Sequence, residues 1–163
     1  MKESIRVRRF REGDEAALFE IFHSAVHRIA VVDYTRRQIE AWAPRTLDAL
    51  AWRDAMRTLA PFVALRGEQP VGYADLQGNG YIDHFFVSGH HPRQGIGGLL
   101  MARLEAEAKR RHLQAMCADV SRTAEPFFAR YGFEVVERRS RRLRGEELAN
   151  AYMRKPLRSE TPA

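Results

Sequence analysis

The segment Pro92-Arg93-Gln94-Gly95-Ile96-Gly97-Gly98-Leu99-Leu100-Met101 follows a short apolar run and opens a long amphipathic stretch. The glycines at 95, 97 and 98 let the backbone turn its N–H groups toward a ligand with no side chain in the way. The positive end of the helix expected after this loop, together with Arg93, favours an anion. The segment therefore predicts a loop that holds phosphate groups, and it indicates a phosphorylated cofactor.

Three kinds of phosphate-binding loop contain glycines at such spacing. The nucleoside-triphosphate kind ends in Gly-Lys-Ser/Thr, which this sequence lacks. The dinucleotide kind needs a third glycine where Leu100 stands, and a strand-helix-strand unit where the sequence indicates consecutive hairpin strands. The third kind lies at the end of a mainly antiparallel sheet and binds the pyrophosphate of an acyl-coenzyme A. A glycine-rich turn without any ligand is the alternative to all three.

Length and composition favour one domain. A chain of 163 residues buries a normal core without disulfides. Its single cysteine, Cys117, lies in a segment typical of a strand, so we expect it to be buried and unreactive. No apolar run approaches the ~20 residues that cross a bilayer, and the first residues show no signal region. These features predict a cytoplasmic protein that does not enter a membrane.

The net charge of +6, from 27 Lys and Arg against 21 Asp and Glu, raises nucleic acid as a partner. The densest basic cluster, residues 138–144, contains no aromatic residue that could stack on a base and is followed at once by Glu146 and Glu147. We therefore favour a solvated face, or one that attracts a polyphosphate cofactor, over a nucleic-acid groove.

Hydrophobic periodicity predicts a chain that mixes strands and helices. Asp14 is expected to cap the first helix, and Thr35 with Gln38 resembles a capping box for the second. The expected strands cover residues 5–10, 62–65, 71–76, 81–87, 115–120, 133–136 and 152–154, and the expected helices cover residues 18–29, 35–42, 47–59, 99–112 and 124–131.

This order of elements resembles the GNAT superfamily of acyl-CoA-dependent N-acetyltransferases, with the glycine loop between the fourth strand and the third main helix. Within that superfamily the chain is most similar to uncharacterised bacterial small-molecule acetyltransferases. Two blocks carry the resemblance: Ile82-Asp83-His84-Phe85-Phe86-Val87 running into the glycine loop, and Ser121-Arg122-Thr123-Ala124-Glu125-Pro126-Phe127-Phe128-Ala129-Arg130-Tyr131-Gly132-Phe133.

The resemblance implies an α/β (α+β) fold. A mixed, mostly antiparallel sheet of six to seven strands would be flanked by helices and would splay between the strand ending near Val87 and the strand beginning near Ala115. A single N-acetyltransferase domain would occupy residues 1–163, with its core at about 5–157.

The resemblance also implies that acetyl-CoA lies in that split. The backbone of Phe85 and Val87 would pair with the pantetheine arm, and the Val87 amide would polarise the thioester carbonyl. Ser121 stands where the family usually has asparagine and would give a further polar contact. The pyrophosphate would be held by the backbone amides of Arg93, Gln94, Gly95, Ile96, Gly97 and Gly98.

Two positions depart from the family pattern. Pro92 replaces the usual Arg or Gln at the loop entrance, where Arg93 can substitute. Phe128 occupies the position at which the family often has a tyrosine that protonates the departing thiolate. A phenylalanine has no proton to give, so the resemblance leaves the catalytic acid unassigned.

Asp83 and Tyr131 are the candidate catalytic residues. Asp83 matches a position where relatives carry a carboxylate that accepts the amine proton, and the alternative is a carboxylate paired with an arginine. Tyr131 lies three residues after Phe128, on nearly the same helix face, and is a candidate acid. The alternative for Tyr131 is packing against the turn at Gly132 and Phe133.

The first helices supply His27, Tyr34 and Trp42 as candidates for the wall of an acceptor pocket, since the family builds that pocket partly from these elements. Packing between helices is the alternative for all three. His23 and His27 have a spacing that can bind metal, but no third ligand is evident, so no metal site is expected.

Three functional hypotheses follow. The first is acetyl transfer from acetyl-CoA to a small-molecule amine by direct attack. The second is acetylation of a protein lysine or N-terminus, and the third is a nucleic-acid-binding or regulatory module that keeps the fold. We also expect exposed strand edges to permit a homodimer.

Overall fold

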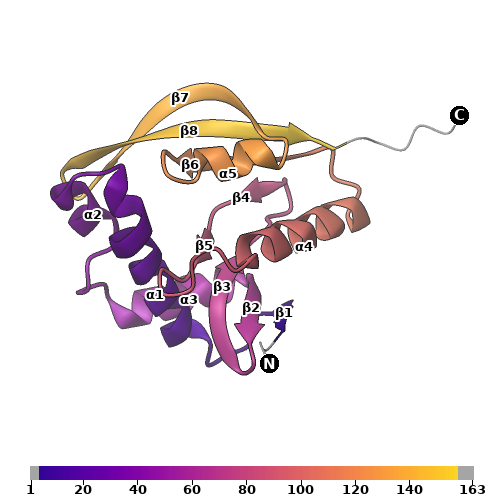
Figure 1. Ribbon diagram of the computed structural model, residues 1–163, viewed down its shortest axis with the longest axis horizontal. Coiled ribbons are helices and arrows are strands. Elements are labelled where there is room, and N and C mark those ends of the chain that lie inside the picture. Colours follow the sequence, from indigo (N-terminus) through magenta and orange to yellow (C-terminus); the bar gives the residue numbers. More distant parts are fainter. Residues whose placement is uncertain (1–3, 158–163) are drawn as a thin grey trace, which may run out of the picture.

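The computed structural model describes residues 4–157, which form two four-stranded sheets flanked by helices (Figure 1). The first sheet has the order β1-β2-β3-β5 and consists of β1 (Ile5–Arg9), β2 (Phe62–Arg66), β3 (Gln69–Ala74) and β5 (Phe85–Val87). The second has the order β4-β6-β8-β7 and consists of β4 (Tyr81–Ile82), β6 (Ala115–Ser121), β8 (Glu146–Pro156) and β7 (Glu134–Leu143). Only the β4–β6 pair is parallel in this part of the chain. The mixed, mostly antiparallel character is confirmed.

The single strand expected over residues 81–87 is wrong, and so is the count of six to seven strands. This segment forms β4 and β5, which belong to different sheets. The break lies at Asp83 and His84, because the Oδ1 atom of Asp75 accepts both of their backbone N–H groups, at 2.9 and 2.7 Å. These hydrogen bonds hold the backbone in place where the chain crosses from one sheet to the other.

The helices are α1 (Glu15–Ser24), α2 (Arg36–Trp42), α3 (Ala49–Leu59), α4 (Ile96–Arg110) and α5 (Glu125–Arg130). The capping box of Thr35 and Gln38 is confirmed. Asp14 is the N-cap residue of α1, as expected, but its side chain makes no capping bond, because its carboxylate accepts two bonds from Arg8 and one from the Arg11 N–H. The helix expected to continue to residue 29 changes to a π-helical turn over Ala25–Ile29, followed by a 3₁₀ turn over Ala30–Val32.

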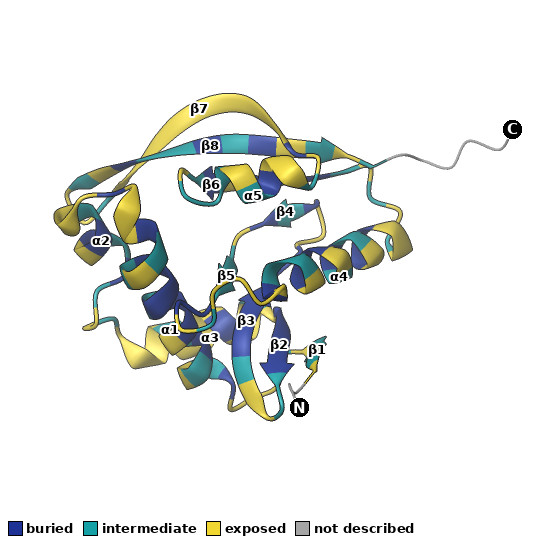
Figure 2. Cartoon of the chain, in the orientation of Figure 1, coloured by how far each residue is buried: buried dark blue, intermediate teal, exposed yellow. Residues whose placement is uncertain are grey.

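β7 and β8 form a hairpin much longer than the short strands expected over 133–136 and 152–154, and Figure 2 shows β7 exposed along nearly all its length. The basic cluster 138–144 therefore lies mainly on an edge strand, and alternation sends its side chains to two faces. Cys117 lies on β6 as expected but is half-buried rather than buried.

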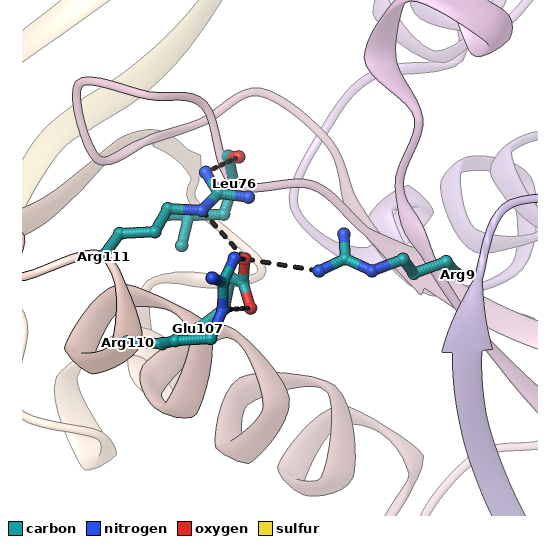
Figure 3. Close-up of polar contacts among 5 residues, drawn as sticks. All are labelled: Arg9, Leu76, Glu107, Arg110 and Arg111. Atoms are coloured by element: carbon teal, nitrogen blue, oxygen red, sulfur yellow. Dashed lines mark hydrogen bonds and ion pairs between the residues drawn. The ribbon is translucent and has the colours of Figure 1, made fainter.

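The C-terminal end of α4 is fixed by Glu107, which is almost fully buried and accepts hydrogen bonds from Arg9, Arg110 and Arg111 (Figure 3). Arg111 also donates to the Leu76 carbonyl at 3.1 Å. The hydrogen bond from Arg110 is the main cause that lowers the pKa of Glu107 to about 2. This network ties α4 to β1 and to the segment after β3, and so positions the helix whose first turn carries the glycine loop.

No helix within residues 4–157 combines the length and the hydrophobicity needed to span a bilayer.

Candidate functional site

The split predicted between the two strands is present, because β5 ends the first sheet and does not pair with β6. In the β3–β5 pair the Ser88 N–H donates to the Val71 carbonyl at 2.8 Å, and the Asp75 N–H donates to the His84 carbonyl at 3.1 Å. Alternation along β5 therefore directs the amides of Phe85 and Val87 away from β3 and toward the split. An extended ligand in the split would meet these free groups.

The glycine loop is bent as an anion-binding loop requires. Arg93 and Gly95 both have positive φ, 58° and 77°, and α4 begins at the next residue, Ile96. Successive N–H groups in such a turn point to one side and form a concavity that suits an anion at the helix N-terminus.

Positions 97 and 98 need glycine for a further reason, because α5 packs closely on the start of α4. A Cβ atom added at Gly97 would lie 3.0 Å from the Phe127 ring, and one added at Gly98 would lie 2.7 Å from the Tyr131 hydroxyl. Of the three glycines in this loop, Gly95 is the one that combines a positive φ with open space around its missing side chain.

The loop between β5 and α4 is hydrogen-bonded to α1 and to the π-helical turn that follows it. The Gly89 N–H donates to the Ser24 hydroxyl at 3.0 Å, and Arg28 Nε donates to the Gly89 carbonyl at 3.3 Å. A Cβ at Gly89 would lie 2.3 Å from the Ser24 carbonyl oxygen, so only glycine fits this approach. The entrance of the phosphate loop is thus held in place by the first helix.

A cavity of about 510 Å³ lies beside this loop and the exposed edge of β5. Every residue that we predicted to bind the cofactor lines it: Phe85, Val87, Arg93, Gln94, Gly95, Ile96, Gly97, Gly98 and Ser121. The π-helical turn and α5 supply part of the remaining wall. The volume lies within the usual range for cofactor and ligand sites.

Two residues with hydroxyl groups, Ser121 and Thr123, line this cavity. The Ser121 hydroxyl accepts the Ala124 N–H at 3.2 Å, so the serine closes a turn as well as lining the site. Thr123, which sequence reasoning missed, has a buried Oγ1 with no hydrogen-bond partner in the described chain. Leaving a hydroxyl buried and unpaired is costly, so this atom is suited to meet a polar group of a ligand.

A second, polar cavity of about 250 Å³ lies next to the first. Trp42 and Ser121 line both cavities, so the two meet at these side chains. The remaining wall comes from Tyr34, Tyr81, Asp83, Asp119, Arg139, Ser140, Arg141, Leu148, Ala149 and Asn150.

Asp83 lines the polar cavity and not the larger one. Its side chain is 47 % exposed, and no arginine pairs with it in the described chain. The nearest basic group is His84 Nε2, at 4.0 Å. Burial is the main cause that lowers the pKa of His84, whose ring faces the α1 side of the sheet and meets the Tyr73 hydroxyl at 3.0 Å. The Asp83 carboxylate is thus available to a ligand.

Tyr131 and Phe128 both line the larger cavity. The Tyr131 hydroxyl lies over Gly98 at the start of α4, and its ring packs on Phe127 with centroids 4.9 Å apart. Phe128 is 3 % exposed and packs edge-on against Phe85. The hydroxyl of Tyr131 therefore lies at the phosphate end of the cavity.

The three candidates for the acceptor wall separate in the structure. Trp42 and Tyr34 line the polar cavity, and the Tyr34 hydroxyl donates to the Ala149 carbonyl at 2.6 Å. His27 lines neither cavity, because its Nε2 contacts the Ala43 carbonyl at 2.8 Å and its ring stacks on His23. Across residues 4–157 no three His, Cys, Asp or Glu side chains are grouped to hold a metal.

Sequence reasoning missed six polar residues of the second cavity. They are Tyr81, Asp119, Arg139, Ser140, Arg141 and Asn150. The only signal for these residues in the sequence was that Arg139 and Arg141 are two positions apart, which places them on the same face of a strand. It could be interpreted only once the length of the β7–β8 hairpin was known.

Comparisons with known proteins agree with this geometry. The model of the GNAT acetyltransferase domain family matches residues 30–150. An uncharacterized N-acetyltransferase of Escherichia coli (strain K12), YafP, is 34 % identical over 152 residues, which are 93 % of this chain and 95 % of that protein.

Two solved structures share the fold. The crystal structure of a GCN5-related N-acetyltransferase from Rhodopseudomonas palustris is 29 % identical, with a TM-score of 0.90 over 96 % of this chain and 98 % of that one. The PaiA N-acetyltransferase of Thermoplasma acidophilum, solved in complex with coenzyme A, is 16 % identical, with a TM-score of 0.73 over 94 % and 99 % of the two chains. The chain therefore belongs to the GNAT family of acetyltransferases and is an acyltransferase.

Proposed function

We propose that residues 1–163 form one domain that transfers the acetyl group of acetyl-CoA to the amine of a small molecule by direct attack. The observation that carries this proposal is the junction of two unlike cavities at Trp42 and Ser121. One has a volume of about 510 Å³ and is lined by the glycine loop, and the other is small and polar. A polar space of about 250 Å³ suits a small molecule better than a folded protein surface.

Acetyl-CoA is the cofactor, and the larger cavity offers groups for each part of it. The amides of residues 93–98 and the N-terminus of α4 hold the pyrophosphate. The free amide edge of Phe85 and Val87 pairs with the pantetheine arm as an added strand does. Ser121 and Thr123 add hydroxyl contacts.

The reaction requires the amine to lose a proton, because an ordinary amine has a pKa of ~10. Asp83 takes this proton, directly or through water. The amine nitrogen then bonds to the thioester carbonyl carbon while the Val87 amide stabilises the developing negative charge on the oxygen. The C–S bond then breaks, the coenzyme A thiolate leaves with its electron pair, and the nitrogen releases its second proton to water as the amide forms.

The leaving thiolate, with a pKa of ~8.5 by analogy with cysteine, takes a proton from water or from Tyr131. Among the described residues Tyr131 supplies the only phenol on the wall of the larger cavity, but its hydroxyl lies beside Gly98. Water can reach the thioester end of the cavity without any movement of Tyr131. Most of the rate enhancement then comes from holding amine and thioester together.

The test uses calorimetry with coenzyme A and a matched pair of glycine variants. Gly95 and Gly13 both have positive φ and open space around the missing side chain, but only Gly95 lines the cavity. Gly95→Val should lower coenzyme A affinity at least tenfold, whereas Gly13→Val should strain the backbone equally and leave affinity unchanged. Absence of binding by the unaltered protein, or equal binding by both variants, would contradict the proposal.

A second measurement identifies the acceptor class. Release of free thiol from acetyl-CoA is followed with polyamines, amino acids, aminoglycosides and aromatic amines. Turnover with one of these classes is expected, and turnover only with peptides ending in a free amine or carrying lysine would assign a protein acceptor instead.

A further inference from the structure

Four charged residues line the polar cavity, and two of them are neutralised within the protein. Arg139 donates to Asp119 at 3.4 Å and to Glu137 at 2.8 Å. Asp119 also accepts the Tyr81 hydroxyl at 2.8 Å. The charges of Arg139 and Asp119 are thus already engaged.

The other two, Asp83 and Arg141, have no such compensation. Within residues 4–157 the Arg141 guanidinium has no ion pair and no hydrogen bond. The only basic atom within 4.0 Å of the Asp83 carboxylate is His84 Nε2. Burial keeps the pKa of His84 below its ordinary value, so this imidazole is neutral at pH 7. One free carboxylate and one free guanidinium therefore line the same small space.

Both residues line the same cavity of about 250 Å³, so one small molecule can meet both charges. After burial, the next influences on the pKa of His84 are Asp83, which raises it, and Arg141, which lowers it. Tyr34 lines the same cavity as Arg141. Arg141 lies on β7, where the β7–β8 register places it opposite the buried Leu148.

The end of the cavity that adjoins the cofactor offers a further acceptor. Asn150 lies opposite Ser121 in the β6–β8 pair, and its Oδ1 is buried with no partner in the described chain. A buried amide oxygen without a donor favours a ligand that brings an N–H group. The amino group of an acceptor placed here would be next to the junction with the larger cavity.

We propose that the acceptor is a small amine that also carries an anionic group, a carboxylate or a phosphate, close to its amino group. Asp83 and Asn150 hold the amino end beside the thioester, and Arg141 binds the anion through its two-pronged guanidinium. This inference depends on the proposed acetyl transfer and specifies its substrate class.

The test compares acceptors that differ by the anionic group alone. L-Phenylalanine is paired with 2-phenylethylamine, and O-phosphoethanolamine with ethanolamine, in the thiol-release assay. The anionic member of at least one pair should have a kcat/KM at least tenfold higher than its neutral partner, and the pair that responds distinguishes carboxylate from phosphate.

Variants of β7 provide the control. Arg141→Gln should raise KM at least tenfold for the preferred anionic acceptor and leave the neutral partner unchanged, while Arg141→Lys should restore part of the preference. Arg142→Gln removes the same charge from the neighbouring exposed position, which lines no part of the polar cavity, and should change neither. Coenzyme A affinity should be the same in all three variants.

Preference for the neutral amines, transfer to neither anionic acceptor, or an equal effect of Arg141→Gln on both members of a pair would overturn this inference. Such results with coenzyme A binding intact would leave the proposed acetyl transfer standing. Loss of coenzyme A binding by the unaltered protein would instead refute the proposed function itself.

Discussion

Asp75 provides a sharp test of how the site is built, because it fixes the break between β4 and β5 with a buried carboxylate. The residue is 1 % exposed. Its Oδ1 accepts the N–H groups of Asp83 and His84, and its Oδ2 is buried without a partner among the described residues. Burial is the main cause that raises the pKa of Asp75 from 3.8 to about 6.

The pKa shift of about 2 units corresponds to about 3 kcal/mol of stability. Because the folded pKa is raised, this stability is present below pH 3.8 and is lost as the pH rises through about 6. Asp75→Asn keeps an oxygen acceptor for both N–H groups but cannot ionise. The free energy of unfolding of the variant, relative to the unaltered protein, should therefore increase by about 2.5 kcal/mol between pH 4 and pH 8.

Urea unfolding followed by tryptophan fluorescence at five pH values measures this difference. Asp54→Asn is the matched control, since it removes one carboxylate from a side chain on α3 that is 70 % exposed. A relative stability of Asp75→Asn that is constant or falls from pH 4 to pH 8 would refute the reasoning.

Three further predictions concern the fold and the cofactor cavity. Gly80→Ala should lower the free energy of unfolding by more than about 1 kcal/mol, since φ is +87° and the new Cβ would lie 2.2 Å from the Ala115 carbonyl oxygen. Gly78→Ala, where the new Cβ would have nothing within 4 Å, should be nearly neutral in the same denaturation assay. Glu107→Gln should lower the melting temperature at pH 7, and because the folded pKa is depressed to about 2, the difference should shrink as the pH falls from 4.5 toward 2. Thr123→Val should leave the melting temperature equal or higher, since it removes an unpaired buried hydroxyl, but should weaken coenzyme A binding about fivefold by calorimetry. An unchanged coenzyme A affinity would show that Thr123 does not contact the cofactor.

Local patterns in the sequence predicted local structure well. The capping box at Thr35 and the glycine loop depend on residues a few positions apart, and both are present. The backbone edge of Phe85 and Val87 was predictable as well, because the family resemblance and the alternation along one strand agree.

Interactions between distant residues were not predictable in this way. The break at Asp83 depends on a carboxylate eight residues earlier, at Asp75, and apolar alternation across 81–87 gives no sign of it. The polar cavity depends on the hairpin that brings Arg141 opposite Leu148. The family resemblance predicted His27 on a pocket wall, but the carbonyl of Ala43, sixteen residues later, holds its ring elsewhere.

The central claim is that the edge of β5 and the glycine loop bind acetyl-CoA. Amide hydrogen exchange, followed residue by residue with NMR, tests it directly. Addition of coenzyme A should slow exchange at the amides of Phe85, Val87 and residues 95–98, while Phe86, which already faces β3, should change little. Binding that protects other amides and leaves these unchanged would contradict the account.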